Sequence, residues 1–493
     1  MEDILYLGNI IYKERKILFG IKRIDRRRHV YIIGKTGIGK TTLLLNMMIQ
    51  DIKNGEGLAF FDPHGDAVNK LLYYIPKERI EDVIYLNPAD LDHPFAFNPL
   101  ENVDFYQRHL ITSSLLSVFK KIWVDAWSAR MEYILTNAIL ALLEYPGTTL
   151  LDINKLLSDD SFRKKVVNHL KDPVVKAFFE KEFEKYHQQF RVEAIAPIQN
   201  KVGQFITNPL IRNIVGQTKS SFDLREIMDR KKILLVNLSV GSIGEENSRL
   251  LGGFLISKLY LSAMSRVDIP EEERVDFYLY VDEFQNFANE SFANILSEAR
   301  KYRLNLILAH QYLDQIDEYL KKAVFGNVGT YIVFRVGSQD AEVFFEELEV
   351  EPEFLINTPS YYAYVKMIVD GKPQPTILAQ TFPLPPLPQV NYLMEIITLN
   401  HLKYTQKREI IEARIKNIFS NRLGSGYVFC RICGNKFFSD DLEICDNCQM
   451  KAVSKISLKE SIEKNLTIKL KEDKKESKVD LDEILKKLEN ESQ

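Results

Sequence analysis

Nine consecutive residues near the start of the chain combine glycines with a lysine and hydroxyl side chains. They are Gly34, Lys35, Thr36, Gly37, Ile38, Gly39, Lys40, Thr41 and Thr42, and the first eight fit the pattern G-x-x-x-x-G-K-[ST]. Glycines let the backbone curl so that successive N–H groups point at phosphate oxygens, and a following helix adds its positive N-terminus. Lys40 can then reach the β- and γ-phosphates of a nucleotide, and the Thr41 hydroxyl can bind Mg²⁺. The sequence therefore predicts a phosphate-binding loop.

Two acidic residues, Asp282 and Glu283, follow an apolar segment much later in the chain. Residues 276–283 are predicted to be a strand that ends in these carboxylates. At that position the first carboxylate can hold Mg²⁺, and the second can orient or deprotonate an attacking water. A strand that ends in Asp-Glu is common, so the catalytic interpretation depends on the phosphate-binding loop in the same domain.

Three polar residues, Asp62, His64 and Asp66, follow the apolar segment at residues 57–62. They lie at the end of a predicted strand, which is the edge where parallel sheets bind ligands. A metal site made of these side chains is one interpretation. Turn formation and hydrogen bonding at the edge of the sheet are favoured over it.

Two further candidates follow later strands. The predicted strand at residues 304–309 ends at His310 and Gln311, and Gln311 places an amide where it can sense the γ-phosphate or the water. Arg335 ends the predicted strand at residues 331–335, which we expect to complete the sheet. A guanidinium is costly to bury, so it either pairs with a carboxylate or faces a phosphate. When Arg335 is considered alone, we favour the ion pair.

The segments that carry these side chains alternate between short apolar strands and helices, which predicts an α/β fold with a mostly parallel sheet. Residues 101–228 differ, because glycine is scarce and apolar residues recur at helical spacing. One helical face contains Met131, Ile134, Leu135, Ala138, Ile139 and Leu142. We therefore expect an α/β domain formed by residues 1–100 and 229–390, interrupted by an all-helical insertion at 101–228.

The composition is that of an ordinary soluble protein, with 45% hydrophobic and 27% charged residues among 493. A net charge of -3 excludes a globally basic nucleic-acid binder, so any such surface must be local. No apolar run approaches the ~18 residues of a membrane-spanning helix, and the first residues lack a basic leader. We expect a cytoplasmic protein.

All four cysteines lie in one short stretch, as one pair made of Cys430 and Cys433 and a second pair made of Cys445 and Cys448. Two C-x-x-C pairs can place four thiolates tetrahedrally around Zn²⁺, and a closed site of this kind is structural rather than catalytic. Residues 425–452 therefore resemble a zinc ribbon, and disulfides or free thiols are the less favoured alternatives. A proline-rich connector at 381–388 and a helical segment at 391–424, read as a stalk or as packing on the motor, precede it. A charged, flexible tail with a short amphipathic helix follows at 453–493.

The ordered set of motifs resembles the TraG/TraD-type coupling ATPases of conjugation and type IV secretion, within the broader HerA/FtsK group. The resemblance covers about residues 15–385 and rests on the loop at 34–42, the turn at 60–66, the helical insertion, and the segments 281–284, 310–311 and 329–335. It implies a RecA-like motor that forms a ring, usually a homo-hexamer, with ATP at subunit interfaces and DNA in the channel.

The resemblance also implies roles for individual residues. Lys40 and Thr41 would bind phosphate and Mg²⁺, Asp282 would support Mg²⁺, and Glu283 would be the catalytic base. The remaining roles are a sensor, Gln311, and a finger that reaches a neighbour's nucleotide, Arg335. Membrane-bound members carry N-terminal transmembrane helices that this sequence lacks, so we expect a translocase that is soluble or recruited to a membrane complex.

The leading hypothesis is an ATP-hydrolysing DNA translocase, with a secretion-channel or relaxase-type protein as partner. One alternative keeps the motor but changes the cargo to protein, for secretion or pilus assembly. The other is a scaffold that binds ATP without rapid hydrolysis and acts through the zinc ribbon. Glu283 argues against the scaffold, because a pure switch needs no catalytic base.

Overall fold

The computed structural model describes the chain except for residues 1–3, 13–14, 102, 420–425, 430–435 and 440–493. The chain divides into two units, residues 1–419 and 420–493. In the second unit, β13 (Gly426–Phe429) and β14 (Lys436–Ser439) pair antiparallel.

The four cysteines that the sequence predicts to bind zinc all lie outside the described residues. Cys430 and Cys433 fall within 430–435, and Cys445 and Cys448 fall within 440–493. The structure therefore does not test these four ligands, and the zinc ribbon stays a prediction.

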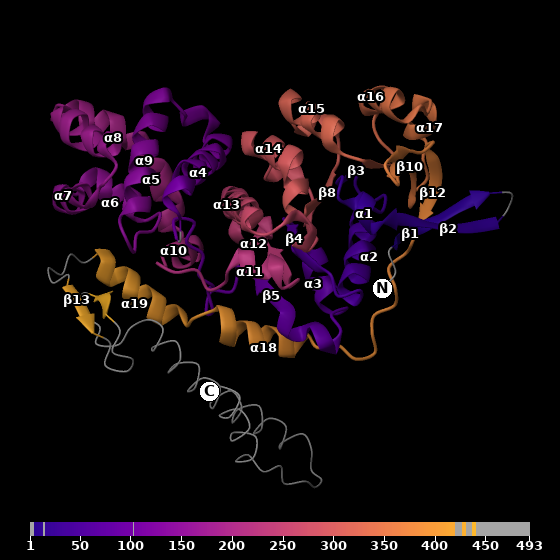
Figure 1. Ribbon diagram of the computed structural model, residues 1–493, viewed down its shortest axis with the longest axis horizontal. Helices are drawn as coiled ribbons and strands as arrows, with labels where there is room; N and C mark the ends of the chain where they lie inside the picture. Colours follow the sequence, from indigo (N-terminus) through magenta and orange to yellow (C-terminus); the bar gives the residue numbers. More distant parts are fainter. Residues whose placement is uncertain (1–3, 13–14, 102, 420–425, 430–435, 440–493) are drawn as a thin grey trace, which may run out of the picture. The chain divides into compact units, whose positions relative to one another are not determined.

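A large sheet forms the centre of the first unit (Figure 1), and it has twelve strands within the described residues. Its strands are β1 (Ile4–Tyr12), β2 (Arg15–Lys22), β3 (Val30–Ile33), β4 (Gly57–Asp62), β5 (Val83–Leu86), β6 (Ile233–Asn237), β7 (Phe277–Val281), β8 (Leu304–His310), β9 (Thr330–Val333), β10 (Tyr362–Val369), β11 (Lys372–Pro373) and β12 (Ile377–Thr381). The order along the sheet is β2-β1-β12-β10-β9-β3-β8-β7-β4-β6-β5, and β11 pairs with β10.

In this order, the seven strands from β9 to β5 run parallel to one another, as predicted. They are covered on both faces, which β3 illustrates: Tyr31 and Ile33 enter one hydrophobic core, and Val30 and Ile32 enter the other. A strand buried on both faces needs an unbroken apolar run. This requirement places the polar residues just beyond the strands, at the carboxyl edge.

The sheet extends further than predicted. The expectation that residues 331–335 complete it is wrong, because β10, β12, β1 and β2 add an antiparallel section beside β9. Strand β10 alternates between buried and partly exposed side chains, which is a weaker signal than an apolar run. Strand β1 pairs with β12 from the opposite end of the first unit, and no local pattern reveals such a pairing.

Helices cover both faces of the sheet. They are α1 (Arg23–Arg26), α2 (Lys40–Lys53), α3 (Asp66–Leu72), α4 (Arg108–Ile122), α5 (Ala129–Glu144), α6 (Asp152–Ser158), α7 (Asp160–His169), α8 (Pro173–Ala177), α9 (Gln188–Thr207), α10 (Pro209–Val215), α11 (Leu224–Asp229), α12 (Val240–Ile243), α13 (Glu245–Met264), α14 (Glu290–Glu298), α15 (Glu318–Asn327), α16 (Ser338–Leu348), α17 (Pro352–Ile356), α18 (Leu393–Tyr404) and α19 (Arg408–Phe419). The described residues between β5 and β6 form helices and loops without a strand. None of the described helices is long and apolar enough to cross a membrane.

Helix α5 confirms the predicted apolar face, since each of its six predicted core residues is at most 1% exposed. Its N-terminus is capped by Ser128, whose hydroxyl accepts a hydrogen bond from the Met131 N–H at 3.2 Å. Farther along the chain, α18 and α19 pack on the first unit rather than project from it. Ile396 of α18 and Ile411 of α19 are fully buried.

Candidate nucleotide site

The phosphate-binding loop connects β3 to α2 and depends on glycines. Gly37 and Gly39 have φ angles of 77° and 116°, in the left-handed region where a side chain would be strained. Tyr361 packs against the loop: its N–H donates to the Ile38 carbonyl at 2.8 Å. Its ring lies close to Gly39, so a Cβ there would approach it to 2.9 Å. The loop is therefore fixed from the side of β10 as well as by its own strand and helix.

Backbone hydrogen bonds tie the same loop to both neighbouring strands. The Gly34 N–H donates to the His310 carbonyl at 3.3 Å, at the end of β8. The Lys35 N–H donates to the Arg335 carbonyl at 2.9 Å, just beyond β9. The structure thus brings the predicted loop next to the ends of the strands that carry Gln311 and Arg335.

The Lys40 side chain folds back over the loop that precedes it. Its ammonium donates to the carbonyl oxygens of Gly34 at 2.7 Å and Lys35 at 3.1 Å. Burial lowers the pKa of Lys40, and the carboxylates of Glu283 and Asp282 oppose that shift. The ammonium is thus a buried cation beside two acids, at the first turn of α2.

The Thr41 hydroxyl donates to Asp282 Oδ2 at 3.0 Å, joining the start of α2 to the end of β7. Burial, together with the nearby carboxylates of Glu283 and Asp62, raises the pKa of Asp282 to about 6, although Thr41 and Lys40 oppose the shift. A buried group of carboxylates with a hydroxyl beside it suits a hard divalent cation, which takes oxygen ligands and relieves the repulsion. The donor set therefore fits Mg²⁺, which Thr41 and Asp282 would hold.

The sequence predicted that Glu283 is the last residue of the strand. In the structure it lies instead in the turn after β7. Its φ and ψ angles are 46° and 51°, a left-handed conformation that costs energy in a residue other than glycine. Its carboxylate accepts hydrogen bonds from Gln311 Nε2 at 2.9 Å and from Gln285 Nε2 at 2.8 Å. The strained turn aims the carboxylate along the strand edge, where two amides fix its position.

The structure brings Gln311 into the site, whereas the Arg335 side chain forms no ion pair with any described residue. Among the residues that the structure describes, no carboxylate lies within 4.0 Å of the Arg335 guanidinium, so the ion pair favoured from the sequence alone is wrong. The Arg335 side chain is partly exposed, and its backbone contacts the phosphate-binding loop. Its position permits contact with a second molecule.

Asp62 fixes a turn. Its carboxylate accepts from the backbone N–H groups of His64 at 2.9 Å, Ala67 at 2.9 Å and Val68 at 3.0 Å. These bonds satisfy the N-terminus of α3, and this is the hydrogen-bonding role that the sequence favoured. Within the described residues, Asp62, His64 and Asp66 do not form a group able to share one metal ion.

Sequence reasoning missed two supporting contacts. Tyr361 is one, and its only sequence signal is the repeated tyrosine before an alternating strand. The other is a hydrogen bond between the Tyr31 hydroxyl and His310 Nε2, which links β3 to β8 beneath the site. Burial, with the charge of Lys40, lowers the pKa of His310 to about 3, so this imidazole is neutral. No spacing in the sequence pairs residues that lie so far apart.

The model of the type IV secretion-system coupling protein DNA-binding domain matches residues 19–348. The type 4 coupling protein DotL of Legionella pneumophila is 21% identical over 364 residues, which are 60% of this chain and 45% of DotL. The chain thus spans a little under half the length of that curated relative.

Solved structures share the fold. The plasmid coupling protein TrwB in complex with ADP and Mg²⁺ has a TM-score of 0.56 and 16% identity, over 80% of this chain and 98% of TrwB. TrwB with a non-hydrolysable ATP analogue has a TM-score of 0.54 and 17% identity, over 76% and 88%. VirB4 of Thermoanaerobacter pseudethanolicus has a TM-score of 0.50 and 13% identity, over 77% and 97%.

Proposed function

The chain belongs to the family of the type IV secretion-system coupling protein DNA-binding domain, and we propose that it is an ATP-hydrolysing motor that moves DNA. The observation that carries the proposal is the 3.0 Å contact between Thr41 and Asp282, which are 241 residues apart. It places a loop of phosphate-binding sequence and an acidic strand end in one site. Nucleotide hydrolysis needs both parts together.

In this proposal, residues 34–42 hold the phosphates and Lys40 neutralises their charge. Mg²⁺, held by Thr41 and Asp282, would supply charge stabilisation at the β- and γ-phosphates. Glu283 takes the proton of the attacking water, and Gln311 holds the Glu283 carboxylate in place. The whole site is assembled on the edge of a rigid parallel sheet, so its groups are positioned before nucleotide arrives.

We further propose that the motor is a homo-hexameric ring with DNA in its channel, in which Arg335 reaches the nucleotide of a neighbouring subunit. The family's DNA-binding description supports DNA as cargo, and the partly exposed Arg335, with no ion pair among the described residues, supports an interface role. The net charge of -3 confines any DNA contact to a local surface such as a channel. The motor's protein partner would be of the relaxase or secretion-channel type.

Substituting Glu283→Gln tests the chemical step. The amide keeps the shape of the side chain but cannot accept a proton, so ATP hydrolysis should fall by about 10²–10⁴-fold while ATP binding persists. Glu346→Gln, which changes an exposed carboxylate on α16, is the matched control and should hydrolyse ATP at the wild-type rate. Equal turnover of all three proteins would refute the role of Glu283.

Displacement of streptavidin from biotin-tagged DNA tests the motor. We expect ATP to drive displacement by the wild type, and the Glu283→Gln variant to be inactive. If the wild type hydrolyses ATP but displaces nothing from single- or double-stranded DNA, the DNA cargo is wrong. Normal ATP binding with negligible turnover by the wild type would instead favour the scaffold.

A further inference from the structure

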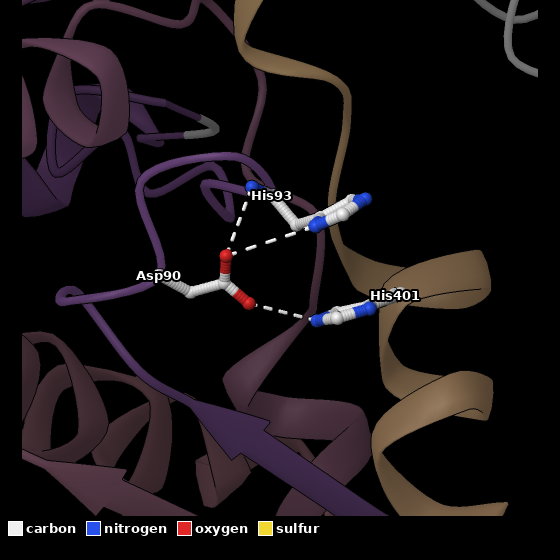
Figure 2. A group of neighbouring side chains, drawn as sticks. All are labelled: Asp90, His93 and His401. Carbon is white, nitrogen blue, oxygen red and sulfur yellow. Dashed lines mark hydrogen bonds and ion pairs between the residues drawn. The ribbon is translucent and has the colours of Figure 1, made fainter.

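Two histidines and an aspartate meet in a part of the first unit that the nucleotide site does not use (Figure 2). Asp90 and His93 lie on the loop after β5, and His401 lies on α18. Asp90 Oδ2 lies 2.8 Å from His401 Nε2, and Asp90 Oδ1 lies 3.7 Å from His93 Nδ1. The two imidazole rings stack with centroids 4.1 Å apart, and each turns a nitrogen toward the same carboxylate.

Both sides of this cluster are held by their own hydrogen bonds. On the loop, the backbone N–H of His93 donates to Asp90 Oδ1 at 3.1 Å. On α18, the neighbouring Asn400 accepts from the Tyr85 N–H at 2.7 Å and donates to the Val83 carbonyl at 3.2 Å, both on β5. The backbones that present the three side chains are therefore fixed, and only side-chain rotation is needed to change their spacing.

The spacing is close to that of a metal site. Each residue offers one ligand atom, and these atoms lie within 4.8 Å of one another; this is the one such group among the described residues. A tetrahedral ion with bonds of about 2.0–2.1 Å separates its ligand atoms by about 3.3 Å. The observed distances of 2.8 and 3.7 Å fall on either side of that value.

The exposure of the group also suits a metal. The Asp90, His93 and His401 side chains are 27%, 37% and 32% exposed, so an ion can enter and water can complete its shell. Two basic residues close to His401 in the sequence are paired elsewhere, Arg408 with Asp92 and Lys403 with Glu81.

We propose that Asp90, His93 and His401 bind a divalent transition-metal ion of the zinc class, which fastens α18 to the loop after β5. Two imidazoles and one carboxylate are ligands that Zn²⁺ favours, whereas Mg²⁺ and Ca²⁺ favour oxygen alone. The ion would join segments 311 residues apart in sequence. This site is separate from the predicted zinc ribbon and does not depend on the proposed DNA cargo.

Zinc stoichiometry of the full chain tests the proposal. The wild type and the double variant His93→Gln/His401→Gln are equilibrated with Zn²⁺, dialysed, and measured by elemental analysis. Glutamine keeps a donor for Asp90 but is a poor zinc ligand. We expect the double variant to hold one equivalent fewer than the wild type. His187→Gln, which alters an exposed histidine before α9, is the matched control and should lose none.

A second background separates the two zinc sites. A full chain with all four cysteines changed to serine should still bind one equivalent of Zn²⁺, and adding the two histidine substitutions should abolish it. Zinc should also raise the thermal unfolding midpoint of the cysteine-free chain, whereas Mg²⁺ at the same concentration should not. Equal zinc content with and without the histidines, or no zinc bound by the cysteine-free chain, would overturn the proposal.

Discussion

At the level of single residues, two groups of the nucleotide site are in unfavourable conformations or surroundings. Glu283 has a left-handed backbone, and Asp282 is a buried carboxyl beside two other acids. Groups arranged in this way are poorly satisfied until a cation neutralises them. The strain and the raised pKa are therefore consistent with a site built for Mg²⁺ and nucleotide.

Substituting Asp282→Asn should stabilise the chain when metal and nucleotide are absent. The Asp282 pKa rises from 3.8 to about 6 on folding, so the folded state holds a proton that the unfolded state has lost, and stability falls as pH rises through that window. The cost above the window is about 3 kcal/mol. In EDTA, the thermal unfolding midpoint of the variant should exceed that of the wild type at pH 8, and the difference should shrink toward pH 5.

Asp125→Asn removes an exposed carboxylate and is the matched control, with no expected gain at either pH. Added Mg²⁺ and ATP should stabilise the wild type and leave the Asp282→Asn variant nearly unchanged. A variant that is less stable than the wild type at pH 8 in EDTA would contradict this account of the site.

Much of the site was predictable from residue types alone. Glycines before Lys40-Thr41 and two acids after an apolar run have few other uses in combination, and the parallel sheet brings their strand ends to one edge. The backbone strain at Glu283 and the packing of Tyr361 could not be predicted. Both depend on how distant segments meet, and no local spacing records such contacts.

At the scale of elements, the same contrast separates the two parts of the sheet. Strand β4 has the bounds that the sequence predicts, because burial on both faces demands an apolar run of that length. The antiparallel section formed by β10, β12 and β1 went unpredicted, since its strands are only partly buried. The sequence left open whether the segment that contains α18 is a stalk or packs on the motor domain. The hydrogen bond from the Tyr85 N–H to Asn400 shows that α18 packs on β5.

Substituting Asn400→Ala should loosen α18 from β5. The buried amide satisfies the Tyr85 N–H and the Val83 carbonyl, so its removal leaves backbone groups at the sheet edge without partners. We expect a loss of about 1–3 kcal/mol in the free energy of unfolding and faster amide exchange at Tyr85. Thr398→Ala removes a partly exposed hydroxyl that donates only within the same helix, to the Met394 carbonyl, and should change neither quantity. Equal stability of both variants would show that α18 is held by other contacts.

At the scale of the whole molecule, the proposed ring would complete each nucleotide site with a residue from a second chain. Arg335 lies beside the phosphate-binding loop and has no ion pair among the described residues. A guanidinium supplied across an interface would complete charge neutralisation only when two subunits close on each other. This arrangement would tie hydrolysis to motion of the ring.

A mixture of two inactive variants tests whether Arg335 acts on a neighbour. The Arg335→Ala variant lacks the arginine finger but keeps an intact phosphate-binding loop. The Lys40→Ala variant has an inactive loop but keeps the arginine finger. If Arg335 acts between subunits, mixed assemblies should recover ATP hydrolysis that neither variant shows alone. Arg335→Ala mixed with Arg335→Ala/Lys40→Ala is the control and should stay inactive. No recovery in mixed assemblies of confirmed size would assign Arg335 to its own subunit.

Hydrolysis at residues 34–42 is proposed to be coupled to DNA. ATP turnover with and without DNA, measured on protein whose assembly size is known, tests this coupling most directly. We predict that DNA increases turnover by the wild type, that the increase weakens with added salt because phosphate contacts are screened, and that Lys40→Ala is inactive throughout. The same wild-type turnover in the presence and absence of single- and double-stranded DNA would contradict the claim.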